Sequence, residues 1–292
     1  MNIKHRITCA IILLILSTHA FALESEVEIS KSKNFQTKFL FEQRQEDLSW
    51  TVRGNTMDIL SELEWKNIKS NSYGIRADTY ANPKIQLFGF LGISNITSGK
   101  TRDSDYCFSG RQGEWSRSIS RASGDQKDFG LGLLYKLVEV AQIPAQSATA
   151  EDGDQELRRF QLNLSTGISR HEQSYRITNG AQVLSIDPSL IAGCTELAGV
   201  VSPPGLGPIP GLNSKYKATW QGPWLGLESK YSLGGWLLRA EFNYHLAQDY
   251  KGVGTWNLRP LYFTQTANGA GMDLQLFSGV QLADNLQIGL QG

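Results

Sequence analysis

Hydrophobic and polar residues alternate along many stretches of this chain, with the period of two that marks a β-strand with one apolar face. In the run WLLRAEFNYHL, from Trp236 to Leu246, the even-numbered residues are apolar or aromatic and the odd-numbered ones from Arg239 are charged or polar. The preceding run, WLGLESKYSL, repeats the alternation, and Gly234-Gly235 between the two predicts a tight hairpin turn. The pattern predicts nine strands, at about 34–53, 59–80, 84–99, 127–139, 158–177, 216–233, 236–250, 259–282 and 286–292.

Alternation of this kind fits either a secreted β-sandwich or an outer-membrane barrel, and three features favour the barrel. Short turns (Asn82-Pro83, Gly234-Gly235 and Asp284-Asn285) generally alternate with longer polar connections, as periplasmic turns alternate with outer loops. The exception is 140–155, an unusually long inner turn. Many runs exceed the roughly 9–11 residues that a tilted spanning strand needs. Aromatic residues also gather near strand ends, where membrane interfaces lie: Trp50, Trp65, Tyr73, Trp220, Trp224 and Trp236. The predicted fold is all-β, a transmembrane antiparallel up-and-down β-barrel.

The N-terminus has the features of an export signal. In residues 1–22 a basic start precedes a short apolar run, and Ala20-Phe21-Ala22 fits the small-x-small cleavage rule. No later segment approaches the roughly 18 consecutive apolar residues of a helical membrane span. We therefore expect a cleaved signal peptide at 1–22, a periplasmic tail at 23–33 and a barrel over 34–292, located in the outer membrane of a Gram-negative-type bacterium.

The predicted number of strands is odd, which indicates that a strand is missing after the C-terminal residue of the sequence. Single-chain bacterial barrels have even strand numbers, and an open sheet edge in hydrocarbon is costly. The sequence reading is therefore that the full-length barrel has ten strands and that the chain is truncated in strand nine. Completing it would take roughly 30–45 further residues, at about ten per strand plus a loop.

Composition and charge exclude several classes of function. The sequence holds 28 basic and 28 acidic residues, so its formal net charge is zero and nothing indicates nucleic-acid binding. We find no Gly-rich phosphate loop and no metal-ligand spacing, so we expect no metal and no cofactor. The expected surroundings are outer-membrane lipids and the expected state is a monomer. The sequence does not identify an extracellular ligand or host surface.

Two cysteines remain after signal cleavage, Cys107 and Cys194. An even pair in an exported chain favours a disulfide over two free thiols. The two residues fall in predicted outer loops at 100–126 and 179–214, so a loop-to-loop disulfide is geometrically possible.

Charged residues on the predicted lumen side form a second candidate feature. We interpret them as an interior salt-bridge network that fills a small barrel, in preference to a selective ion path. The members are Arg76, Asp78, Arg159, Glu228, Lys230, Arg239, Glu241 and His245.

The stretch GKTRDSDYC in the second outer loop places Asp103 and Asp105 two residues apart. Ten strands with an Asp-x-Asp at this place resemble the omptin outer-membrane proteases, and Leu63-Glu64-Trp65-Lys66 is similar to that family's Leu-Asp-Trp-Lys. More specifically, the segments 59–66, 99–106 and 255–259 resemble the protochlamydial outer-membrane protein family, which is related to omptins but not established as protease. The resemblance extends from residue 34 to the end.

Omptin-like catalysis also requires an Asp-x-His pair across the barrel mouth, because a histidine coupled to an aspartate activates water. The resemblance puts those positions at Gly254 and Trp256, neither of which can accept a proton from water. The remaining candidate, His245, stands about nine residues below the matching position, so we expect it to lie beyond reach of Asp103. Asp103 and Asp105 therefore remain weak catalytic candidates.

The sequence thus favours a non-enzymatic outer-membrane barrel with long surface loops, serving surface architecture, adhesion or limited small-solute passage. One alternative is a diverged omptin-like outer-membrane endopeptidase. Another is a small porin, although ten strands lie nearer the filled eight-strand barrels than the 16-strand porins.

Overall fold

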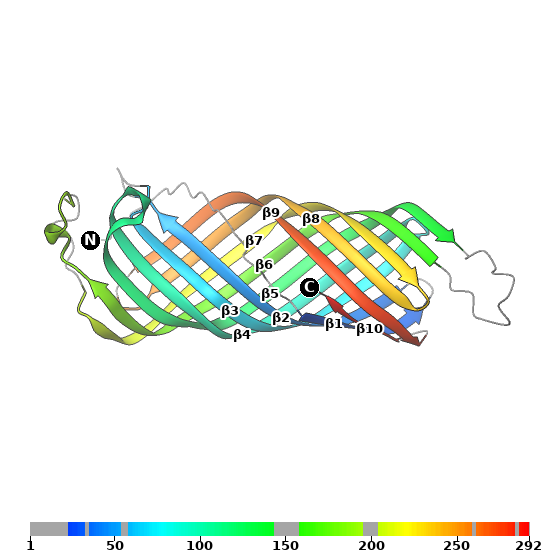
Figure 1. The fold of residues 1–292 in the computed structure, drawn as a ribbon, viewed down its shortest axis with the longest axis horizontal. Helices are drawn as coiled ribbons and strands as arrows, with labels where there is room; N and C mark the ends of the chain where they lie inside the picture. Colours follow the sequence, from blue (N-terminus) through cyan, green and yellow to red (C-terminus); the bar gives the residue numbers. More distant parts are fainter. Residues whose placement is uncertain are drawn as a thin grey trace, which may run out of the picture.

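The structure is a computed structural model that describes residues 23–32, 35–53, 58–142, 158–194, 204–258, 261–283 and 286–291 (Figure 1). Within these residues no helix is long and apolar enough to cross a membrane. The helical segments are two single 3-10 turns, η1 (Ser109–Arg111) and η2 (Pro188–Leu190). The predicted signal peptide at 1–22 lies outside the described residues.

Ten strands form one closed antiparallel sheet in which each strand pairs with its sequence neighbours and β1 pairs with β10. In chain order the strands are β1 (Leu23–Ser32), β2 (Phe35–Val52), β3 (Ser61–Asn82), β4 (Ile85–Phe108), β5 (Gln112–Gln142), β6 (Arg158–Ser185), β7 (Gly207–Leu233), β8 (Trp236–Trp256), β9 (Leu261–Ala283) and β10 (Leu286–Gln291). The predicted up-and-down barrel is confirmed.

Strand β1 corrects the sequence reading of the N-terminal segment. The tail predicted at 23–33 is instead a strand, and it takes the place in the sheet for which the sequence reading required a strand beyond Gly292. In its sequence, LESEVEISKS, three glutamates alternate with small or apolar residues, but three apolar residues in ten make a much weaker apolar face than the runs predicted as spanning strands. β1 pairs only with the part of β2 from Phe35 to Gln43, and β10 pairs only with the part of β9 from Phe277 to Ala283. These two short strands therefore close the ring at its inner end.

The predicted outer loop at 100–126 is also corrected. β4 and β5 continue through it as a paired hairpin, joined by η1 with positive φ angles at Gly110 and Arg111. Above the membrane the outer face of the sheet meets water and not lipid, so the outward apolar residues that mark a spanning strand stop while the pairing continues. The predicted turns at Asn82-Pro83 and Gly234-Gly235 lie between β3 and β4 and between β7 and β8. The turn predicted at Asp284-Asn285 lies outside the described residues, as does the long inner turn from residue 143 to 155.

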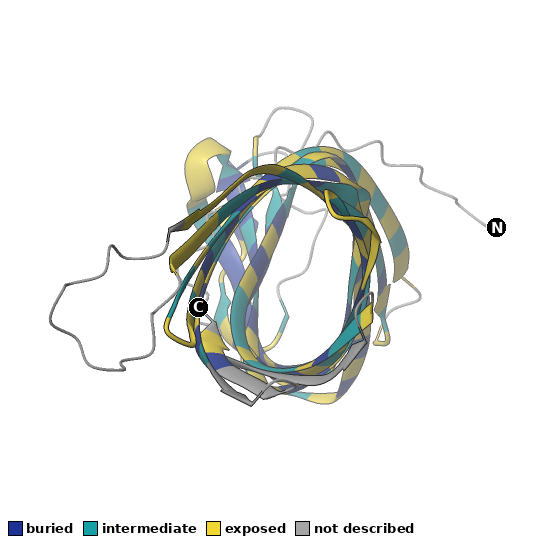
Figure 2. Cartoon of the chain, turned by 90° about the vertical axis from the view of Figure 1, so that its right-hand side faces the viewer, coloured by how far each residue is buried: buried dark blue, intermediate teal, exposed yellow. Residues whose placement is uncertain are grey.

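The outer surface of the barrel carries a belt of exposed apolar side chains, and many inward side chains are polar or charged. Exposed and buried residues alternate along the strands (Figure 2). On β8, for example, Leu238, Phe242 and Tyr244 are exposed whereas Arg239 and Glu241 are buried. The belt ends abruptly along the strands: on β5 the outward Phe129 is followed, toward the outer end, by the outward Lys127 and Asp125. This is the pattern of a barrel spanning a bilayer. It places the β2–β3, β4–β5, β6–β7 and β8–β9 connections at the outer end.

Candidate functional site: the barrel lumen

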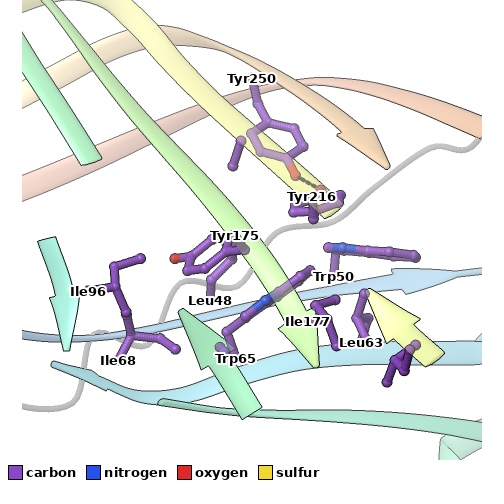
Figure 3. Close-up of a cluster of buried hydrophobic side chains, with 13 residues drawn as sticks. Leu48, Trp50, Leu63, Trp65, Ile68, Ile96, Tyr175, Ile177, Tyr216 and Tyr250 are labelled. Atoms are coloured by element: carbon purple, nitrogen blue, oxygen red, sulfur yellow. Dashed lines mark hydrogen bonds between the residues drawn. The ribbon is translucent and has the colours of Figure 1, made fainter. Parts of the chain in front are cut away.

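A cluster of aromatic rings occupies the outer half of the lumen (Figure 3). We call it the outer aromatic cluster: Trp50, Trp65, Tyr175, Tyr216 and Tyr250, which come from five different strands. The Trp65 ring stacks on Tyr216 at 4.6 Å between centroids and on Tyr175 at 5.2 Å. The Tyr216 and Tyr250 hydroxyls are hydrogen-bonded to each other. Because these residues occupy inward positions in register, the rings meet inside the barrel and narrow it.

A polar group lies below this cluster, at the level where the outward belt ends. His171 Nδ1 lies 2.5 Å from Asp128 Oδ1, and Arg44 donates to the other oxygen of Asp128 at 2.6 Å. Arg44 also pairs with Glu42 at 2.6 Å. We call these four residues the Arg–Asp–His group. Sequence analysis missed it, although alternation along β5 and β6 puts Asp128 and His171 on the inward face, where they are direct cross-strand partners.

The inner end of the lumen holds most of the predicted charge network. Glu228 is 1% exposed and binds Lys230 at 2.9 Å, and Asp78 is fully buried and accepts from Arg76 at 3.1 Å. Arg239 lies over the Phe277 ring, and Glu241 accepts from Asn243 at 3.0 Å. Burial of these charges is tolerated because each meets a partner of opposite charge, a polar group or a ring face.

Two members of the predicted network differ in their surroundings. Arg159 is exposed at the inner rim, where it lies 3.7 Å from Glu139, so it stands apart from the buried group. His245 Nε2 lies 2.7 Å from Asp273 Oδ2, and Asp273 also accepts from Asn243 at 3.2 Å. His245 therefore belongs to a second His–Asp couple, which its neighbours in sequence did not reveal.

Asp103 and Asp105 lie above the outer aromatic cluster, at the mouth. Asp103 pairs in register with Leu63 on β3 and with Ser118 on β5, and Leu63 is packed inside the barrel. The two aspartates therefore share the inward face, and both are partly buried. Each has an interaction within the protein.

The mouth positions to which the resemblance assigned an Asp and a His lack that chemistry. Gly254 fits against Phe263, where an added Cβ would lie 2.0 Å from a ring carbon, and Trp256 packs on the outer aromatic cluster. His245 pairs with Gly271 and binds Asp273, on the inner side of Tyr250 along β8. The described part of the chain has two histidines, His171 and His245, and both lie deeper than this mouth. It also contains no group of three or more His, Cys, Asp or Glu side chains arranged for a metal ion.

Outside the membrane, the β2–β3 connection and the β4–β5 hairpin are tied together by charged contacts. Arg111 binds both oxygens of Glu62, at 2.6 and 2.9 Å, and this hydrogen bonding raises the pKa of Arg111. Asp58 accepts the Gly110 N–H at 2.9 Å, and that bond, with one from Ser109, lowers the pKa of Asp58. A disulfide joins Cys107 to Cys194, with Cα atoms 5.4 Å apart, and it is the pair that the sequence predicts.

A closed ten-stranded barrel with an apolar outer belt and a polar lumen defines an outer-membrane β-barrel protein. The chain belongs to the Protochlamydia outer membrane protein (Pom) family, whose sequence model matches residues 38–291. Among solved structures it is similar to the outer membrane protease OmpT from Escherichia coli, with a TM-score of 0.60 and 13% identity over 94% of this chain and 84% of that chain. At this identity the likeness concerns the fold alone. No curated protein matches the sequence.

Proposed function

We propose that this protein is a non-enzymatic outer-membrane barrel through which small polar solutes pass to a limited extent. The observation that carries the proposal is a lumen that remains polar and reachable by water at mid-height. His171 is 27% exposed although it sits on β6, on the far side of the ring from β1 and β10. His245 and Asp273 are 25% and 34% exposed, and an added Cβ at Gly269 would meet no atom within 4 Å. Water therefore reaches both His–Asp couples.

The same geometry sets a size limit on any solute. The outer aromatic cluster occupies the lumen above the Arg–Asp–His group, and buried ion pairs occupy much of the space below. A ten-stranded barrel also lies much nearer in size to filled eight-stranded barrels than to 16-stranded porins. Passage is consequently restricted to small solutes. Because the lining mixes Arg44, His171 and His245 with Glu42 and Asp273, we expect weak charge selectivity.

The direct experiment is to reconstitute the full-length protein in planar bilayers and vesicles and to measure conductance and uptake of small sugars. We expect small conductance steps and uptake that falls sharply with solute size. The matched variant is Gly269→Leu, which extends a side chain into open lumen, and the control is Leu274→Met on the lipid side of the same strand. Absence of conductance above empty bilayers, or conductance unaffected by Gly269→Leu, would contradict the proposal.

A second role, surface display, is favoured by the outer hairpins. The β4–β5 hairpin continues well past the outward apolar belt and is tied by the disulfide to the β6–β7 connection. A disulfide and charged contacts at a protruding tip preserve a defined surface.

The enzyme alternative lacks a second catalytic pair at the barrel mouth. Cleavage of basic peptides by the refolded protein, abolished by Asp103→Ala, would restore that alternative.

A further inference from the structure

The outer, extramembrane face of the barrel carries two groups of cations in direct register, and the groups are offset by two residues between β5 and β6, where Arg121 is paired with Thr178 and Arg176 with Ser123. Lys66 on β3 is paired with Lys100 on β4, and Lys100 is paired with Arg121 on β5. Farther round, Arg176 on β6 is paired with Lys215 on β7. All five side chains are exposed. We call these five residues the basic row.

Placing like charges directly opposite each other is unfavourable in a sheet, because the side chains are only about 5 Å apart at their Cβ atoms. The chain as a whole has zero formal net charge, so the row reflects segregation and not an excess of basic residues. Two carboxylates near the row are each shared between two cations: Glu64 binds Arg102 and Lys66, and Glu172 binds Arg170 and Lys217.

Four members of the row have no ion-pair partner among the described residues. Within the described part of the chain, no ion pair is found for Lys100, Arg121, Arg176 or Lys215. Lys66 lies 3.0 Å from Glu64 and keeps half of its side chain exposed. A set of aligned cations without internal counter-charges is suited to bind an external anion that repeats its charge along its length.

The height of the row above the membrane distinguishes among anions. Lys100 lies seven residues beyond Ile93, the last outward apolar residue of β4, and Arg121 lies eight residues beyond Phe129 on β5. At about 3.3 Å per residue and a tilt of about 40°, these spacings correspond to roughly 18–20 Å above the belt. The polar headgroup region adds only about 5–8 Å on each side of a bilayer. The row therefore stands clear of lipid phosphates.

The surroundings of the row also disfavour a protein partner. Its register neighbours Ser123, Thr178 and Thr255 are small and polar. The exposed apolar side chains beside it lie at its edges, Ile119 beyond Arg121 on β5 and Tyr262 beyond Thr255 on β9, and do not form a buried centre. Specific protein interfaces draw their affinity from such anchors in a buried centre. A flexible polyanion needs none, because its binding arises from charge contacts and release of counterions.

We propose that the basic row is a binding surface for a linear anionic polysaccharide that bears sulfate or phosphate groups. Five strands at about 4.8 Å spacing span roughly 19 Å, enough for several sugar units. The inference does not depend on solute passage through the lumen, since the row lies on the outer wall.

The test uses the full-length protein in neutral detergent micelles and a fluorescent heparin oligosaccharide as the probe. We expect binding that weakens steeply with salt, and much weaker binding of the same oligosaccharide after removal of its sulfates. Lys100→Gln/Arg121→Gln should reduce affinity by about fivefold per removed cation, or about 25-fold together. Lys84→Gln/Lys127→Gln, a matched loss of two exposed cations away from the row, should change affinity by less than about twofold.

A second readout is independent of ligand labelling. Because the row repels itself, Lys100→Gln/Arg121→Gln should raise the unfolding midpoint without ligand, and heparin should raise the midpoint of the wild type more than that of the variant. Equal weakening by the two double variants would overturn the proposal. So would equal binding of the desulfated probe, or preference for anionic lipid vesicles or an acidic peptide over heparin. A result against solute passage in the conductance experiment leaves this measurement unaffected.

Discussion

Phe242 provides a sharp test of which face of the barrel meets lipid. It is 44% exposed, and its register partners Leu227 and Leu274 are exposed apolar residues on the same face. Trp236, at the inner end of the same strand, is 58% exposed and marks the inner interface. Six residues separate the two, which is about 20 Å along the strand and roughly 15 Å along the membrane normal at a tilt of about 40°. Since the apolar belt of such barrels is about 25 Å tall, Phe242 lies near its middle.

Phe242→Arg should therefore lower the free energy of unfolding by about 2–4 kcal/mol, as measured for charges at the bilayer midplane. This corresponds to a change of about 30- to 900-fold in the unfolding equilibrium. The assay is reversible denaturant unfolding of the protein in lipid vesicles, followed by tryptophan fluorescence. Free energies of unfolding are compared between variants whose dependence on denaturant concentration has the same slope.

Two controls separate the effect of the charge from other causes. Phe242→Ala removes the ring without adding charge, and Trp236→Arg adds the same charge at the interface, where the cost should fall to about 0–1 kcal/mol. If Phe242→Arg is no more costly than Phe242→Ala, or if the two arginine variants cost the same, the assignment of lipid and lumen faces is wrong.

Three further outcomes follow from the described contacts. Trp65→Ala should lower the free energy of unfolding by about 3–5 kcal/mol, because a fully buried ring is removed from the outer aromatic cluster; a loss below about 1 kcal/mol in denaturant unfolding would show that the cluster is not packed as described. Cys107→Ser/Cys194→Ser should cost about 2–5 kcal/mol, since the disulfide links residues 87 apart in sequence, and the stability of the variant should match that of reduced wild type. The lowered pKa of Asp58 means that its bond to Gly110 contributes above the unfolded Asp value of about 3.9 and is lost as pH falls through the lower folded value. The protection of the Gly110 amide against hydrogen exchange, relative to an unfolded peptide at the same pH, should fall over that window in the wild type, whereas Asp58→Asn should remove this change in protection.

The alternation from Trp224 to Leu246 determined the local structure of the chain by itself. A spanning strand must turn apolar side chains to lipid and can turn polar ones inward, so the sequence has to repeat with a period of two wherever it crosses the membrane. The turn between these strands was equally readable, because Gly234 and Gly235 both adopt positive φ angles that glycine favours. Both features depend only on residues adjacent in the chain.

Other features depended on the closed ring. The strand at Leu23–Ser32 carries little apolar pattern, and its role is set by pairing with β10 at the opposite end of the chain. Asp128 and His171 are 43 residues apart, and only the β5–β6 register brings their side chains together. The hairpin at 100–126 was read as a loop, because above the membrane its outer face meets water and needs no apolar side chains.

The sequence therefore determined which segments span the membrane and which face of each meets lipid, because the bilayer imposes that choice residue by residue. The tertiary structure decided what the lumen contains. The contacts among the outer aromatic rings, the two His–Asp couples and the basic row on the outer wall all arise between strands, where register and ring closure bring together residues that no local period relates.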